Sequence, residues 1–130
     1  MTLTARFKHL QWDESTTAEP GDGLVFKEAE VAYAYEGDLE GRSTLRYQLC
    51  YAGEQAAHFV GFERFEGRLS GREGTLVWRN EGAWEDGAAV GGGPIVAGTG
   101  ALAGVTGEVR FRAVHAPENT LTLEVTLPAP

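Results

Sequence analysis

"GTGALAGVTGEVRF", residues 98–111, is the stretch that decides the fold, because its glycines either hold a phosphate or turn a strand. Gly98, Gly100 and Ala103 match the spacing of a dinucleotide-binding loop, which in that use opens a helix. Here the cluster leads into EVRF, which alternates like a strand, and residues 105–130 are too few for the rest of a βαβ unit. We therefore expect glycines that turn strands, and no nucleotide cofactor.

The same glycine pattern occurs elsewhere in the chain. Residues 67–78, GRLSGREGTLVW, and residues 100–111, GALAGVTGEVRF, share G-x-L-x-G-x-x-G followed by alternating apolar positions. A shorter copy, GDLEG, stands at residues 37–41. This repetition favours tight passages between strands, for which glycine supplies positive φ angles.

Alternation with period two runs through nearly every segment between turn signals, which is typical of strands with one buried face. In residues 45–51 the expected inward side chains are Leu45, Tyr47, Leu49 and Tyr51. The expected strands are 3–12, 27–35, 45–51, 58–65, 75–80, 93–99, 108–115 and 121–127. About eight short strands predict an all-β antiparallel barrel or sandwich with little helix.

Two segments are expected to be irregular. Asp13–Asp22, DESTTAEPGD, is predicted to be a polar loop, and APEN at 116–119 a turn. The glycine-rich segment 91–100 fits either a strand or a mobile lid.

Composition limits the possible functions. The 130 residues, 42% hydrophobic, predict one domain over residues 1–130. A net charge of −8 argues against nucleic acid and anionic membrane partners. A single cysteine, no signal-peptide pattern and no apolar run near the ~20 residues of a bilayer span predict a cytoplasmic protein.

Several stretches resemble one bacterial family, the domain of unknown function 3224. They are Trp12-Asp13-Glu14, Gly37–Gly41, Gly61–Gly74 (GFERFEGRLSGREG) and Gly98–Gly107. That family looks like a relative of the allene oxide cyclase and dirigent barrels. The resemblance implies a small antiparallel β-barrel with an interior cavity and a possible homo-oligomer, but it carries over no catalytic residue.

Conventional catalytic signatures are missing from the sequence. His9, His58 and His115 are far apart and no metal-ligand spacing occurs, so we expect no metal. Ser70 and Cys50 lack the motifs of activated nucleophiles. We expect chemistry, if any, without a cofactor.

Glu63 is the most informative candidate residue. In HFVGFERF it shares a face with Phe59 and Phe65, so an inward face would place a carboxylate among aromatic side chains and raise its pKa. We predict Glu63 as acid, base or hydrogen-bonding group, with Tyr33 and Tyr47 as its polar companions. The structural alternative is that Glu63 ties down backbone or pairs with Arg72.

The remaining candidates are expected to line a ligand site. These residues are Tyr35, Phe59, Phe65, Trp78, Asn80 and Phe111. The alternative for the tyrosines is a core role with hydroxyls reaching water at the rim.

Ala29, Gly61 and Ala113 are small residues expected to leave interior volume. The resulting hypothesis is a barrel that binds a small, largely apolar or amphipathic metabolite and is possibly a cofactor-independent isomerase or cyclase. The alternatives are a non-catalytic carrier barrel and a structural module with a filled core.

Overall fold

The protein is an all-β fold of eight long strands. The structure, a computed structural model, describes residues 1–53 and 56–129, which contain no helix. The strands are β1 (Thr2–Gly21), β2 (Leu24–Gly37), β3 (Leu39–Ala52), β4 (Ala57–Leu69), β5 (Arg72–Glu85), β6 (Ala88–Gly100), β7 (Thr106–Ala113) and β8 (Asn119–Thr126). Accordingly, no helical segment of these residues has the length and hydropathy that a bilayer crossing requires.

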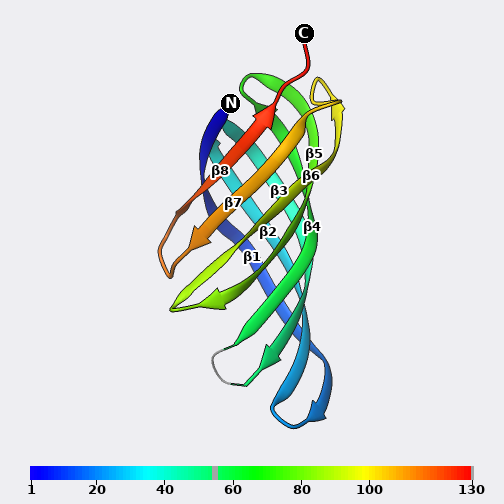
Figure 1. Cartoon of the computed structure of the whole chain (residues 1–130), viewed down its shortest axis with the longest axis vertical. Helices are drawn as coiled ribbons and strands as arrows, with labels where there is room; N and C mark the ends of the chain where they lie inside the picture. Colours follow the sequence, from blue (N-terminus) through cyan, green and yellow to red (C-terminus); the bar gives the residue numbers. More distant parts are fainter. Residues whose placement is uncertain (54–55, 130) are drawn as a thin grey trace.

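Each strand pairs antiparallel with the next, and β1 also pairs with β8, which closes the sheet into a barrel. The closing register runs from Thr2 opposite Glu124 to Phe7 opposite Asn119. In Figure 1 the two termini lie at one end, and the β1–β2 hairpin projects farthest at the other. The predicted eight-stranded antiparallel barrel is therefore confirmed.

Inward and outward side chains alternate as the sequence predicts. Leu45, Tyr47 and Leu49 of β3 are buried, whereas Arg46 and Gln48 between them are exposed. The same alternation places the apolar residues of the other strands in one continuous core inside the barrel.

Three leucines close the barrel at the end that carries the termini. Leu39, Leu69 and Leu102 come from the three glycine-flanked repeats, and each is completely buried. The third repeat forms a turn at residues 101–104 that passes from β6 to β7, so its glycines turn strands as expected. The repeat therefore supplies a plug for one end of the lumen.

Glycines let the strands approach closely beside this plug. Gly67 pairs with Gly41 on one side and Gly74 on the other, and Gly74 pairs with Gly100. A Cβ at Gly67, where φ is +154°, would lie 2.1 Å from the carbonyl oxygen of Glu40. A Cβ at Gly74 would lie 2.1 Å from the carbonyl oxygen of Thr99. Only glycine fits where neighbouring backbones meet like this.

Two expectations about irregular segments need comment. The prediction of a polar loop at Asp13–Asp22 is wrong, because β1 continues to Gly21 and pairs with β2 along its length. This part of the hairpin projects from the barrel and is exposed on both faces, so it carries no apolar alternation. Segment 91–100 lies within strand β6, which settles the choice between strand and lid.

We predict that Gly67→Ala destabilises the barrel far more than Gly71→Ala in the same hairpin. At Gly67 φ is positive and an added Cβ would clash with the backbone, so the free energy of unfolding should fall by about 3 kcal/mol or more. Gly71, at φ +82°, has open space around it and should lose only about 1 kcal/mol. Urea unfolding of both variants measures this, and equal losses would contradict the role given to the glycine row.

Candidate functional site

Glu63 lies inside the barrel, on the inward face of β4, and its side chain is completely buried. Its Oε2 accepts hydrogen bonds from the Tyr35 hydroxyl and, at 2.5 Å, from Ser43 Oγ. Its Oε1 accepts one from Asn80 Nδ2 at 2.9 Å. Three strands adjacent to or near β4 thus supply donors to a single carboxyl group, as buried charge requires.

Opposing effects act on the pKa of this carboxyl group. Burial is the larger effect and raises the pKa of Glu63, while the donors Ser43, Tyr35 and Asn80 lower it. The net result is a pKa above the ordinary glutamate value. Such a group exchanges a proton closer to neutral pH than an exposed glutamate does.

Three phenols surround Glu63 and stay protonated. Burial, with the nearby Glu63 charge adding to it, raises the pKa of Tyr33 and Tyr35. Tyr47 interacts with the Tyr33 hydroxyl and the Asn80 amide, and burial raises its pKa as well. These hydroxyls are therefore hydrogen-bond donors, not bases, across the physiological range.

Two buried polar atoms beside Glu63 have no hydrogen-bond partner. They are Trp78 Nε1, a donor, and Asn80 Oδ1, an acceptor. Trp78 pairs with Glu63 across the β4–β5 ladder, and Asn80 follows two residues later on the same inward face. Each buried polar atom without a partner lowers the stability of the fold by about 1–3 kcal/mol, so these two atoms need an explanation.

The end of the barrel opposite the leucine plug is here called the open end. Toward it, aromatic side chains form a closed ring of contacts, here called the aromatic collar. Its members are Phe7, His9, Trp12, Tyr33, Tyr47, Phe59 and Phe111. Neighbouring rings lie between 5.0 Å (His9 to Tyr33) and 6.2 Å (Phe59 to Phe111) apart, and the contacts return from Phe111 to Phe7. Phe59 pairs with Gly82 and Glu63 with Trp78, so the collar lies on the side of the Glu63 cluster that faces away from the leucine plug.

The collar is partly accessible to solvent. Trp12 is 42% exposed, His9 is exposed, and Phe59 and Phe111 are half-buried. Although His9 as a residue is exposed, its ring packs against Trp12 and Tyr33, and this partial burial lowers the pKa of His9, so its imidazole is neutral at physiological pH. The open end therefore presents an aromatic surface with one neutral hydrogen-bonding ring.

The structure brings together most of the side chains expected to form a site. Glu63, Tyr33, Tyr35, Tyr47, Trp78 and Asn80 belong to the buried cluster, and Phe59 and Phe111 to the collar. Phe65 is completely buried and pairs with Ser43 and Leu76, on the plugged side of Glu63. Phe65 is thus a floor residue, beyond direct reach from the open end.

Sequence reasoning missed Ser43 and the collar residues of β1. Ser43 continues the alternation of Leu45 and Tyr47, so extending that strand by two residues would have found it. Trp12 could not be found this way, since a bulge between His9 and Gln11 shifts the alternation by one residue. The bulge turns Trp12 to the same side as His9.

Three details expected from the sequence are wrong. Arg72 does not pair with Glu63 but donates to the Pro128 carbonyl oxygen at 2.6 Å. The hydroxyl of Tyr35 bonds to Glu63 instead of reaching water at the rim. Gly61 leaves no void, because a Cβ there would lie 2.6 Å from the Arg46 carbonyl oxygen.

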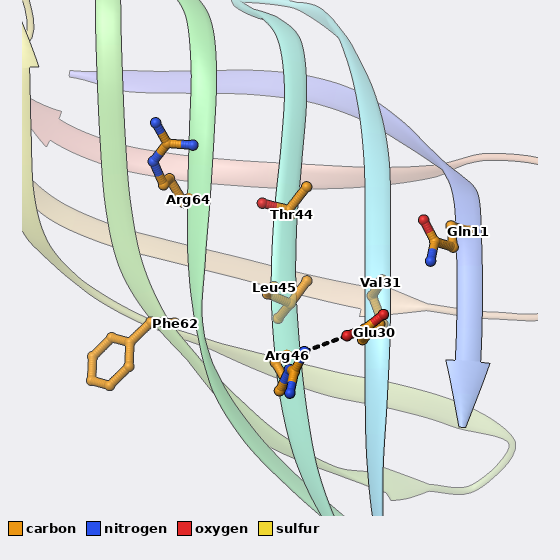
Figure 2. A pocket seen from close by; sticks show the side chains of 8 residues that line it. All are labelled: Gln11, Glu30, Val31, Thr44, Leu45, Arg46, Phe62 and Arg64. Atoms are coloured by element: carbon orange, nitrogen blue, oxygen red, sulfur yellow. Dashed lines mark hydrogen bonds and ion pairs between the residues drawn. The ribbon is translucent and has the colours of Figure 1, made fainter. Parts of the chain in front are cut away.

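Two surface hollows lie on the outer wall of the barrel. The larger, about 410 Å³, is lined mainly by the outward side chains Gln11, Glu30, Thr44, Arg46, Phe62 and Arg64 (Figure 2). Arg46 is already bonded to Glu30 there. The lining is exposed and its Arg46 and Glu30 already neutralise each other, so it is less suited to catalysis than the buried cluster. Within the described residues, no three His, Cys, Asp or Glu side chains converge to hold a metal.

Comparisons with known proteins agree with this architecture. The model of the family "Protein of unknown function (DUF3224)" matches residues 3–125. A crystal structure of a DUF3224-family protein of unknown function from Shewanella oneidensis MR-1 superposes with a TM-score of 0.83 at 21% identity. The match covers 100% of this chain and 98% of that one, and at this identity it establishes the fold alone. No curated protein matches the chain.

We predict a pH-dependent difference between the wild type and Glu63→Gln. Because the folded-state pKa lies above the ordinary 4.5, the carboxyl group favours folding fully below about pH 4.5. That contribution is lost as pH rises through the raised pKa. Urea unfolding from pH 4 upward should show the free energy of unfolding of the wild type falling relative to that of Glu63→Gln.

Glu66→Gln provides the control, because Glu66 lies on the exposed face of the same strand. Its stability profile should run parallel to that of the wild type. A Glu63→Gln profile that is also parallel would show that Glu63 is not perturbed by burial.

Proposed function

This chain belongs to the DUF3224 family, whose members are proteins of unknown function, and we propose that it binds a compact, largely apolar molecule at the open end of the barrel. The observation that carries this proposal is the aromatic collar, exposed at Trp12 and His9, next to a buried carboxyl–phenol cluster. Aromatic walls with a few convergent polar groups are typical of small-molecule sites.

The collar favours a flat or cyclic apolar ligand. Trp12 and Phe59 present ring faces and edges, and stacked or edge-on contacts with another ring contribute beyond the area that they bury. The neutral His9 at the entrance can bond a polar substituent without requiring a charged ligand.

If the bound molecule reacts, the chemistry that fits is proton transfer without a cofactor. Glu63 as carboxylate would take a proton from one carbon of the ligand and return it to another, so that the ligand is isomerised and the enzyme is unchanged. The protonated Tyr33 and Tyr47 would donate hydrogen bonds to a carbonyl oxygen that gains charge. A relationship to the allene oxide cyclase and dirigent barrels, which the sequence suggested, is part of the same proposal.

Two other functions remain distinct from this one. A carrier barrel would use the collar without the proton transfer. A structural module would have a full lumen, and one observation favours it: the ring of Phe59 fills the space that Gly82 and Gly91 leave, where Cβ atoms would lie 2.8 and 3.0 Å from its Cζ. A ligand must therefore bind above Phe59 or displace it.

Native mass spectrometry of the protein purified from its own host tests binding. We expect a small molecule retained in stoichiometric amount, and Trp12→Leu should lose it. Phe62→Leu is the control, because Phe62 is 61% exposed on the outward face of β4. Retention that is equal in both variants would place the ligand elsewhere.

The released molecule then serves as the substrate to test for turnover. Glu63→Gln keeps the shape of the side chain but cannot accept a proton, so an isomerase should lose about 10²-fold or more in kcat. Binding should persist in this variant. Unchanged turnover would remove Glu63 from the mechanism, and no turnover by the wild type would leave the carrier function.

A further inference from the structure

The unpartnered atoms of Trp78 and Asn80 specify a kind of ligand group. Trp78 Nε1 can only donate a hydrogen bond and Asn80 Oδ1 can only accept one. Both side chains are at least 98% buried, and both project inward from β5, two residues apart. The two atoms together lack one acceptor and one donor, which is the pair of capacities that a single hydroxyl group has.

The orientation of the Asn80 amide is set by its neighbours. Its Nδ2 donates to Glu63 Oε1 at 2.9 Å, which directs the carbonyl oxygen away from the carboxyl group. With Glu63 ionised, reversing the amide would place two acceptors against each other, so Oδ1 is the free atom in that state. The available acceptor thus follows from the Glu63 contact.

The barrel wall is irregular at the same level. The β5–β6 register shifts between Val77 and Trp78, and Pro94 on β6 has no N–H to donate to the ladder. Bulges of this kind are frequent next to functional sites, where they redirect a side chain. The irregularity coincides with the two unpartnered atoms.

Resting on the proposed function, we infer that the ligand carries a hydroxyl group, which accepts from Trp78 Nε1 and donates to Asn80 Oδ1. A hydroxyl group is the smallest organic group with both capacities. A ketone or ether oxygen would satisfy only Trp78, and an ammonium group only Asn80. The ligand class is therefore a compact apolar ring bearing an alcohol, phenol or enol, bound with the Phe59 ring displaced, the ligand ring toward the collar and the oxygen toward Glu63.

Isothermal titration calorimetry with three ligands of similar shape tests this inference. The probes are 2-naphthol, 2-methoxynaphthalene, which accepts but cannot donate, and 2-methylnaphthalene, which does neither. We expect 2-naphthol to bind the wild type about tenfold more tightly than 2-methylnaphthalene, the effect of one or two net hydrogen bonds. The methoxy compound should bind less tightly than 2-naphthol.

The variant Trp78→Phe tests whether the preference for 2-naphthol depends on the N–H of Trp78. This variant removes the N–H and keeps an aromatic ring, so the advantage of 2-naphthol should fall to near parity while 2-methylnaphthalene still binds. Trp84→Phe on the same strand is the control and should keep the full advantage. The wild-type comparison stands even if Trp78→Phe fails to fold.

Two results would overturn the inference in different ways. Equal affinity of the wild type for 2-naphthol and 2-methylnaphthalene would mean that an ordered water occupies the two atoms, while the proposed binding function would stand. No binding of any probe, together with no retained molecule in the host-purified protein, would overturn the proposed function as well.

Discussion

Closure of the sheet is the constraint on which everything else depends. Once β1 pairs with β8, every second side chain of each strand must enter one narrow lumen. Eight strands leave room for side chains and little more, so each inward residue is packed against others from several strands. This is why one inward carboxyl group on β4 meets hydroxyl and amide groups from β2, β3 and β5.

The two ends of the lumen differ in the side chains that cover them. At one end, leucines from the glycine-flanked repeats form an apolar plug, and the glycines allow the strands to draw together there. At the other, the strands continue outward as long hairpins and the aromatic collar stays partly open. Access to the buried cluster is therefore expected from one direction only.

Burying Glu63 is costly, and its donors compensate only in part. The carboxyl group keeps a raised pKa despite three hydrogen bonds, and two further polar atoms beside it have no partner. A core selected for stability alone would more simply hold apolar side chains of similar volume here. The incompletely paired polar groups around Glu63 therefore favour a binding function over a purely structural module.

The sequence by itself determined the strand content and most of the inward faces, because local alternation reports which face of a strand is buried. Its repeats likewise indicated glycine turns in place of a nucleotide loop. In residues 58–65 both faces carry aromatic side chains, so only the tertiary structure decided that Glu63 points inward. The tertiary structure decided which inward residues meet. Ser43 reaches Glu63 from the neighbouring strand β3, Trp12 joins the collar only through a bulge, and the space at Gly61 is filled by neighbouring backbone. These outcomes depend on register and shear between strands, which alternation within one strand cannot encode.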